Sequence, residues 1–362
     1  MDVRSVLRLF FRYTNRMLLV ISLFCYASSL VSPETLWIAG FLALAIPVCM
    51  VGHLVLLITW LVIGKLRMAI YPAVGLLAAF PYWRATFALN LPSNTTPDFE
   101  VLSYNVRLFN AYDRAEHSAQ AKAIVQWVIH DSSDIKCLQE YYQLDSSQLF
   151  NISQRMDRRA GYYHYFSPCC NNDLGGEMGL AIYSRFPIVN QGFIDLKGRY
   201  RYGAIFADVV VRKDTVRIYN IHLQSMSINE HAIFQNSSDT EKIKHVLKDL
   251  FQRLRYGFIR RGMQIQIILQ HIASSPYRVI LCGDLNDVPY SYTYYQFSRF
   301  LENTFESAAS GFGFTYNGKL FFLRIDNQFY SKGLQPTYLR TIRQVDYSDH
   351  FPLKAGYSIL PR

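Results

Sequence analysis

The first ninety residues contain three long runs that are almost free of charge, and these runs limit what the chain can fold into. Residues 17–33 and 36–64 contain no Asp, Glu, Lys or Arg, and residues 68–91 contain only Arg84. A helix that crosses the hydrocarbon core of a bilayer needs about 20 consecutive apolar residues. The sequence therefore predicts a transmembrane anchor in residues 1–91, with about three helices over residues 17–32, 36–64 and 68–90.

Basic residues beside these runs predict the orientation of the anchor. Four arginines precede the first run, and Lys65 and Arg67 separate the second from the third, whereas residues 32–35 contain no Lys or Arg. Because basic residues collect on the cytoplasmic side of a membrane, three spans would place the chain after residue 91 outside the cytoplasm. We expect a multi-pass protein of the inner (cytoplasmic) membrane, with its larger domain on the periplasmic side. A cleaved signal peptide is the alternative for the first run.

The rest of the chain has the composition of a globular domain. Residues 92–98, which are polar and contain two prolines, predict a short linker. Residues 91–362 carry 30 basic and 25 acidic side chains, a mild excess that permits an anionic substrate without specifying one. Strand patterns interrupted by helical patterns over residues 99–362 predict a layered α/β domain.

Polar side chains stand at the ends of the strand-like runs of this domain. The run "RVILCGDLND" ends in Asp284 and Asn286, which are separated by one residue and would project from the same face of a strand. Other runs end in, or lead to, Asn105, Glu140, His222, Asp326, Asp349 and His350. Oxygen ligands from several strands are typical of a site for a hard cation such as Mg²⁺. Each residue alone is more typical of a turn or a cap, and only the combination indicates a site.

The order of these segments resembles that of a known family. It is similar to the endonuclease/exonuclease/phosphatase (DNase I-like) superfamily in the segments "LSYNVR", "CLQE", "YSRFPI", "NIHL", "CGDLND", "RIDNQFYS" and "SDHFP". The resemblance covers residues 99–358 and implies a catalytic domain, over 99–362, with the four-layer α/β/β/α sandwich of the family. It also implies cleavage of phosphodiester or phosphomonoester bonds by water with a divalent cation, usually Mg²⁺, with Mn²⁺ as the alternative.

The resemblance assigns residues to the metal and to the substrate. It makes Asn105, Glu140 and Asp349 metal-site residues, with Glu140 as the principal carboxylate ligand. Arg185, in "YSRFPI", would help to position the substrate.

The resemblance also assigns the catalytic roles. Asp284 would activate or orient the attacking water, and Asn286 would hold the phosphate and the nucleophile. His350 would contact the scissile phosphate, and Asp326 would orient its imidazole. His222 would stabilise the phosphorane or protonate the leaving oxygen. These five residues are the catalytic group that we expect the fold to bring together.

The substrate class stays open between nucleic acid, a phospholipid head group and a small phosphodiester. A nuclease needs a basic groove, which the net charge permits without showing. A lipid-head-group phosphodiesterase, similar to a sphingomyelinase, needs apolar or aromatic loops beside the site; the tyrosines that follow the "GDLND" segment either form one or belong to the core: Tyr290, Tyr292, Tyr294 and Tyr295.

Two alternatives come from other functional classes. A non-catalytic, membrane-anchored binding scaffold would be indicated by the loss of a ligand carboxylate or a histidine, and none is lost. A transporter would need charged or polar groups in the helices, and only one histidine and one arginine are present there. We expect a phosphate ester and the lipid bilayer as partners, and nothing in the sequence predicts a protein partner.

Overall fold

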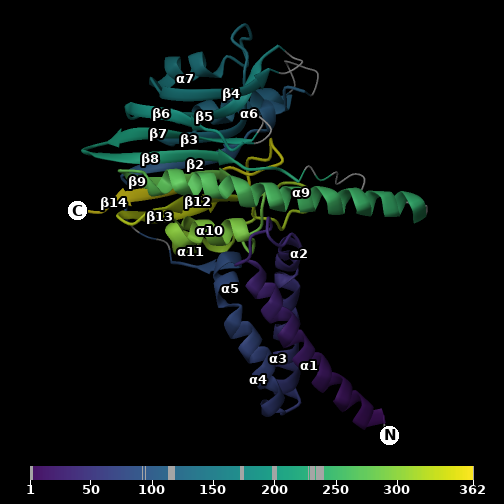
Figure 1. The fold of residues 1–362 in the computed structure, drawn as a ribbon. Coiled ribbons are helices and arrows are strands. Elements are labelled where there is room, and N and C mark those ends of the chain that lie inside the picture. Colours follow the sequence, from purple (N-terminus) through teal and green to yellow (C-terminus); the bar gives the residue numbers. More distant parts are fainter. Residues whose placement is uncertain are drawn as a thin grey trace.

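The chain divides into a helical part and an α/β part. The computed structural model describes residues 3–91, 93, 95–112, 119–171, 175–197, 202–226, 228, 233 and 240–361. In Figure 1 the first helices extend away from two stacked sheets, with the N-terminus at the far end of the helices and the C-terminus in the α/β part. We call these helices, residues 3–86, the stalk.

The stalk has five helices within the described residues: α1 (Val3–Ser28), α2 (Ile38–Leu44), α3 (Ile46–Val62), α4 (Leu66–Ala78) and α5 (Phe80–Thr86). The second and third expected helices are each divided, at Ala45 and at Ala79, because Pro47 and Pro81 lie in the first turns of α3 and α5. Proline has no N–H and suits the first turn of a helix, where that group would have no partner.

The expected limits of the helices were wrong at several ends. α1 begins at Val3 and not at residue 17, because the arginine-bearing turns before the apolar run continue the same helix and arginine is a good helix former. The third expected helix ends at Thr86 and not at residue 90. The next residues form strand β1 (Phe87–Leu89), which pairs antiparallel with β11 (Ser310–Phe312) of the α/β part.

The stalk helices pack around a small apolar core that includes Cys25, Ile46, Cys49 and Met50. None of the helices in the described residues has, by itself, both the length and the apolar composition of a membrane span. The pair α2 and α3, which is bent by 40° at its break, meets both requirements together.

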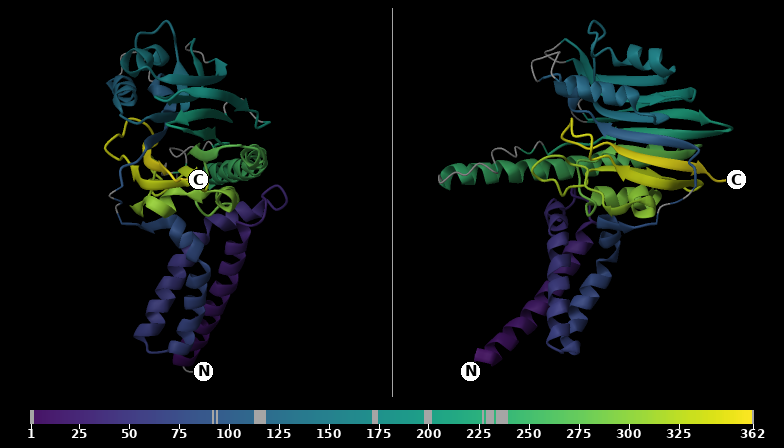
Figure 2. Two further views of the ribbon diagram at one scale, coloured as in Figure 1. Left: turned by 90° about the vertical axis from the view of Figure 1, so that its left-hand side faces the viewer. Right: turned by 180° about the vertical axis from the view of Figure 1, so that it is seen from behind.

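Two six-stranded sheets form the centre of the described α/β part (Figure 2), in the orders β10-β12-β9-β8-β7-β6 and β13-β14-β2-β3-β5-β4. The first sheet consists of β6 (Ile188–Ile194), β7 (Gly203–Val211), β8 (Asp214–His222), β9 (Arg278–Asp284), β10 (Glu302–Asn303) and β12 (Asp326–Tyr330). The second consists of β2 (Phe99–Asn105), β3 (Ile135–Gln143), β4 (Tyr163–Asn171), β5 (Glu177–Ser184), β13 (Leu334–Thr341) and β14 (Leu353–Ile359). β8 and β9 are parallel, as are β2 and β3, and the other neighbours are antiparallel.

The sheets face each other across an apolar layer, in which Ile218 and Cys282 of the first sheet and Val101 and Cys137 of the second are fully buried. Helices cover the outer faces. α6 (Ala119–His130) and α7 (Ile152–Ala160) pack on the second sheet, and α9 (Thr240–Ala273) and α10 (Tyr292–Phe300) on the first, with the short helices η1 (Arg107–Asn110) and α11 (Thr304–Ala308) in connections. The expected α/β fold with two mixed sheets was confirmed.

A buried amide joins the two sheets. Asn220 of β8 is fully buried, and its Nδ2 donates to the carbonyl oxygens of Leu138 and Ala181 in the second sheet, at 2.9 Å each. Its Oδ1 accepts a bond of 2.6 Å from Nε2 of Gln139. One side chain of the first sheet therefore fixes two strands of the second, next to Glu140.

Replacing Asn220 with Leu keeps the volume of the side chain but removes its hydrogen bonds. The carbonyls of Leu138 and Ala181 and the amide of Gln139 would stay buried with fewer partners, and each such group costs about 1–3 kcal/mol. We expect Asn220→Leu to lower the free energy of unfolding by about 3 kcal/mol, measured by urea denaturation with circular dichroism. Gln191→Leu, at an exposed amide of edge strand β6, should change it by less than about 0.5 kcal/mol. Equal losses of unfolding free energy in the two variants would show that the buried hydrogen bonds of Asn220 do not stabilise the contact between the sheets.

Candidate active site

Strand β9 ends in a tight turn that carries the central polar residues. Gly283 has a φ of +144°, and a Cβ atom there would lie 2.0 Å from the carbonyl oxygen of Ile221 in β8, so only glycine fits. Asp284 follows, and its Oδ1 accepts a bond of 2.8 Å from the N–H of Asn286, whose φ is 49°. The Asn286 amide also donates to Asp284 Oδ2, at 3.2 Å. The two side chains meet as expected, but a left-handed turn, and not strand alternation, brings them together.

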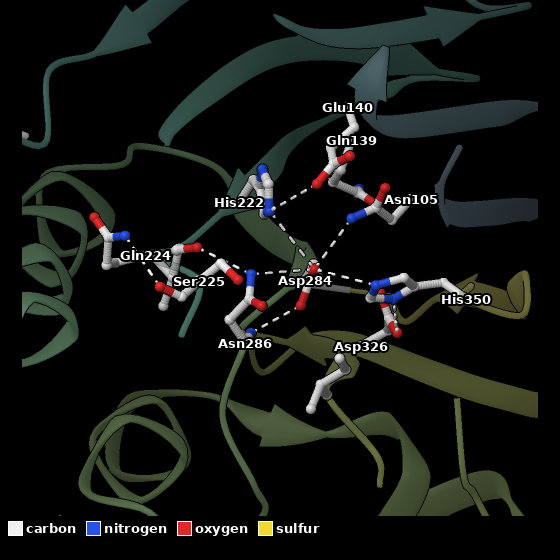
Figure 3. Close-up of polar contacts among 12 residues, drawn as sticks. Asn105, Gln139, Glu140, His222, Gln224, Ser225, Asp284, Asn286, Asp326 and His350 are labelled. Carbon is white, nitrogen blue, oxygen red and sulfur yellow. Dashed lines mark hydrogen bonds and ion pairs between the residues drawn. The ribbon is translucent and has the colours of Figure 1, made fainter. Parts of the chain in front are cut away.

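The Asp284 carboxylate lies at the centre of the site (Figure 3). It is 1% exposed, and its Oδ2 accepts a bond of 3.1 Å from Nδ2 of Asn105. The same oxygen lies 3.6 Å from Nε2 of His222 and 3.7 Å from Nε2 of His350. Burial raises the pKa of Asp284 to about 6, with a contribution from Asp326, against the opposing effect of the two imidazoles. A carboxylate with this pKa can accept a proton near neutral pH, as a general base must.

His350 is oriented by a buried carboxylate. Its Nδ1 lies 2.8 Å from Oδ2 of Asp326, and both side chains are buried. Asp326 pairs with Asp284 in the register of β12 and β9, and its N–H donates to Oγ1 of Thr315 at 3.1 Å. Burial lowers the pKa of His350, but the charges of Asp326 and Asp284 outweigh burial and raise it well above its usual value. The two carboxylates therefore favour the protonated imidazole and fix its orientation, with Nε2 toward Asp284.

Glu140 and His222 face each other from the two sheets. Glu140 has a φ of 46° and lies in a bulge of β3 between Leu138 and Tyr141. Such bulges change the direction of a side chain at a sheet edge. Its carboxylate is 30% exposed, and Oε1 lies 3.8 Å from Nε2 of His222. His222, which pairs with Asp284 in register, therefore stands between the partly exposed Glu140 and the buried Asp284.

Asp349 is connected to the site through Ser348 and Asn105. Oγ of Ser348 donates to the backbone carbonyl of Asn105 at 2.8 Å. The Asp349 carboxylate is 39% exposed and lies 3.8 Å from Nε of Arg107. The N–H of Arg107 donates to Oδ1 of Asn105 at 3.1 Å. Asn105 therefore bridges Asp284 and the segment that carries Asp349.

The donors in this region fit a hard cation. The predicted ligands Glu140, Asp349 and Asn105 offer oxygen atoms, and the two carboxylates are partly exposed. A second group, with ligand atoms within 4.8 Å of one another, is formed by Asp284, Asp326 and His350. Oδ1 of Asp326 is buried and has no hydrogen-bond partner among the described residues. His350 and Asp326 already bond each other. The more exposed set of Glu140, Asp349 and Asn105 therefore suits better an ion that keeps water molecules in its shell.

Arg185 lies away from these residues, and its expected role in positioning the substrate stays a prediction. It follows Ser184, which pairs with Ile135 at the start of β3, whereas Glu140 lies near the end of that strand. About five strand residues, or about 17 Å, separate the two positions. Arg185 lies 3.7 Å from Asp134 and donates to the Tyr162 hydroxyl at 3.1 Å. Because β5 runs antiparallel to β3, the end of β5 that carries "YSRFPI" points away from the site.

Two residues of the site were missed in the sequence. Arg107 brings a guanidinium, 55% exposed, to the side of Asp349, and its signal was its place two residues after Asn105. Asn220 fixes the strand next to Glu140. The sequence pattern that could have identified it is its two-residue spacing to His222 in "NIHL", which puts both side chains on one face of β8.

The sequence matches two family models. The model of the endonuclease/exonuclease/phosphatase family matches residues 102–350, a range that contains every residue of the site described above. A model of a domain of unknown function (DUF8431) matches residues 8–86, which lie within the stalk. No curated protein matches the chain.

Solved structures match a large share of the chain. An endonuclease/exonuclease/phosphatase family protein from Leptotrichia buccalis is 16% identical, with a TM-score of 0.52 over 72% of this chain and 100% of its own. A family protein from Bacteroides vulgatus is 14% identical, with a TM-score of 0.52 over 72% of this chain and 98% of its own. The human nocturnin catalytic domain with a bound sulfate anion is 18% identical, with a TM-score of 0.51 over 74% of this chain and 96% of its own. At these identities the likeness shows a shared fold.

Replacing Asp326 with Asn tests the electrostatic coupling to His350. The variant keeps the shape of the side chain but removes a negative charge 2.8 Å from Nδ1, so the pKa of His350 should fall by at least about one unit. NMR titration of the imidazole in metal-free protein measures this pKa, with His350→Gln to assign the signal. Asp195→Asn, at an exposed carboxylate in the connection after β6, should leave the pKa unchanged. The coupling does not exist if Asp326→Asn leaves it unchanged as well.

Proposed function

The chain belongs to the endonuclease/exonuclease/phosphatase family, and from this premise we propose that it is a divalent-metal-dependent phosphohydrolase. Water would attack the phosphorus of a phosphodiester, or of a phosphomonoester, and release an alcohol. The observation that carries the proposal is the buried Asp284 carboxylate between the imidazoles of His222 and His350, with Asp326 behind His350.

The geometry suggests how the protein's own groups would share the reaction. Asp284, with its pKa of about 6, would take the proton of the attacking water, and the amide of Asn286, 3.2 Å from that carboxylate, would help to place the water. Negative charge grows on the phosphoryl oxygens in the transition state, so preorganised donors stabilise it. The imidazolium of His350 is such a donor, and His222 would stabilise the phosphorane or give a proton to the leaving oxygen.

Glu140, Asp349 and Asn105 would hold the cation, for which we propose Mg²⁺ with Mn²⁺ as the alternative. When bound, a divalent cation polarises a phosphoryl oxygen and lowers the pKa of its bound water. Support comes from the oxygen-rich donor set and from the partial exposure of its two carboxylates. A non-catalytic scaffold is disfavoured, because the oriented imidazole and the carboxylates are all in place.

Substitution of Glu140 tests the role of the cation. We expect the purified full chain to hydrolyse bis(p-nitrophenyl) phosphate with Mg²⁺ and to lose this activity with EDTA. Glu140→Gln keeps the shape but removes the charge of the principal ligand, and losing such a ligand should lower kcat/KM by about a hundredfold and raise the Mg²⁺ concentration needed for half-maximal activity. Release of p-nitrophenol and a Mg²⁺ titration measure both.

Glu177→Gln is the matched control, because Glu177 is an exposed carboxylate on β5 at the same end of the second sheet. It should behave like the wild type. No hydrolysis of this ester, of DNA, of RNA or of phospholipids by the wild-type chain would end the proposal, as would full activity in Glu140→Gln.

We also propose that the stalk anchors the protein in the inner membrane, with the catalytic domain on the periplasmic side. Support comes from the large apolar side chains that α3 and α4 expose: Val48 is 73% exposed, Val62 81%, Leu66 67% and Leu77 75%. Exposed apolar surface of this kind is typical of contact with lipid or with another protein.

The free end of α9 supports a position of the α/β part close to a membrane surface. In Figures 1 and 2 this helix projects beyond the sheets, close to the end of the stalk that meets the α/β part. Phe251 of α9 stacks on Phe41 of α2 at 4.8 Å, and Ile243 and Leu247 are 43% and 56% exposed beside several lysines. An amphipathic helix with basic residues suits the surface of an anionic membrane.

Reporter fusions test the orientation. A periplasm-dependent alkaline phosphatase fused after residue 95 should be active, and a cytoplasm-dependent fluorescent protein at the same position should be dark. Three spans with basic residues on the cytoplasmic side would produce this pattern. The opposite pattern would reverse the orientation, and recovery of the unfused chain in the soluble fraction would refute the anchor.

A further inference from the structure

An apolar cavity lies between the stalk and the α/β part. Its volume is about 470 Å³, within the range of small-molecule sites. One wall is the break between α2 and α3, with Pro47 and Val48. The facing wall belongs to loops of the α/β part and includes Val288, Phe314 and Phe322.

Three chain segments connect this cavity to the catalytic group. Val288 follows Asn286 by two residues, and Arg324 precedes Asp326 by two. Phe314 precedes Tyr316 by two, and the ring of Tyr316 meets that of His350 at 5.7 Å. Two residues of extended chain span at most about 7 Å. Three residues of the cavity lining therefore lie within about 7 Å of chain from Asn286, Asp326 and Tyr316, next to the catalytic group.

The cavity offers carbon surface to an incoming molecule. Among its described lining residues Arg324 is the only charged one, and its guanidinium is already bonded to the carbonyl of Ala85 at 2.6 Å and to Asn327. Two of the lining side chains are open to the surroundings: Val48 is 73% exposed and Phe322 is 52% exposed. An apolar chain could therefore reach the cavity from the outside of the stalk.

We propose that this cavity holds the apolar tail of an amphiphilic phosphate ester whose phosphate lies at Asp284. The proposal rests on the phosphohydrolase function above and names the substrate class of the same site: a phosphate ester with a long alkyl or isoprenyl chain, and not a nucleic acid. Each fully buried CH₂ group strengthens binding by roughly fourfold, so a few of them are enough to distinguish a tailed ester from a short one.

Matched variants of exposed residues test the proposal. Val48→Trp would fill the cavity, whereas Val51→Trp, on the same helix and 58% exposed, lies outside its lining. Phe322→Ser would make the cavity more polar, with Phe321→Ser, 65% exposed and also outside the lining, as its control. None of these residues belongs to the catalytic group, and all are exposed, so the variants should fold.

Two substrates separate the tail from the phosphate: hexadecyl p-nitrophenyl phosphate and ethyl p-nitrophenyl phosphate. We expect Val48→Trp and Phe322→Ser to lower kcat/KM at least about tenfold for the hexadecyl ester and to leave it unchanged for the ethyl ester. The two control variants should hydrolyse both esters like the wild type. The proposal would be overturned by equal effects on the two esters or by no effect on either. The same loss in the control variants would also overturn it, because the loss would then come from a disturbed stalk and not from the cavity.

Binding without turnover separates this proposal from the proposed function. In EDTA, hexadecyl phosphate should bind the wild-type chain at least about tenfold more tightly than ethyl phosphate, and Val48→Trp should remove the difference. If neither ester is hydrolysed but this Val48-dependent binding is found, the cavity assignment stands and the hydrolase function fails. If both esters are hydrolysed with equal kcat/KM and both phosphates bind equally, the hydrolase stands and the tail site is refuted.

Discussion

Burial of the Asp284 carboxylate is the constraint on which the rest of the site depends. A carboxylate that is 1% exposed is costly unless charged or hydrogen-bonding partners surround it. Both sheets supply those partners: His222 comes from the first, and Asn105 from the second. The residual cost appears as the raised pKa, about 6. The partners therefore stabilise the charge only in part, which leaves Asp284 able to take up a proton at the centre of the fold.

Much of the fold and the site could be predicted from the sequence, because both depend on local signals that appear in order. The strand patterns led to a layered α/β domain. The resemblance added the two packed sheets and pointed to residues that the structure places around Asp284. The reason for one contact was not visible: Asp284 and Asn286 meet through a left-handed turn after Gly283. Strand alternation predicted the same contact, but it is not the cause of the contact. β9 ends at Asp284, so Asn286 lies beyond the strand.

The features that the sequence did not predict depend on strand direction and on irregular backbone. Arg185 stands in a motif of the family, but β5 carries it to the far end of the second sheet. The direction of Glu140 depends on a bulge in β3, and a bulge has no clear pattern of residue types. The limits of the stalk helices depend on where tertiary pairing begins, as at Phe87, which joins β11. Sequence periodicity carries little information on any of the three.

The junction with the stalk makes the helices more than a tether. Arg324, two residues before Asp326, donates to the carbonyl of Ala85 at the end of α5, at 2.6 Å. Its guanidinium also stacks on the rings of Phe305 and Tyr294, at 4.3 and 5.3 Å. A buried guanidinium keeps its hydrogen-bond partners in place, because leaving its charge without them would be costly. Here the partners are the carbonyl of Ala85 and the side chain of Asn327. The position of the stalk is therefore coupled to the strand that orients His350, and a substrate tail held against the stalk would lie in a fixed relation to the reacting phosphate.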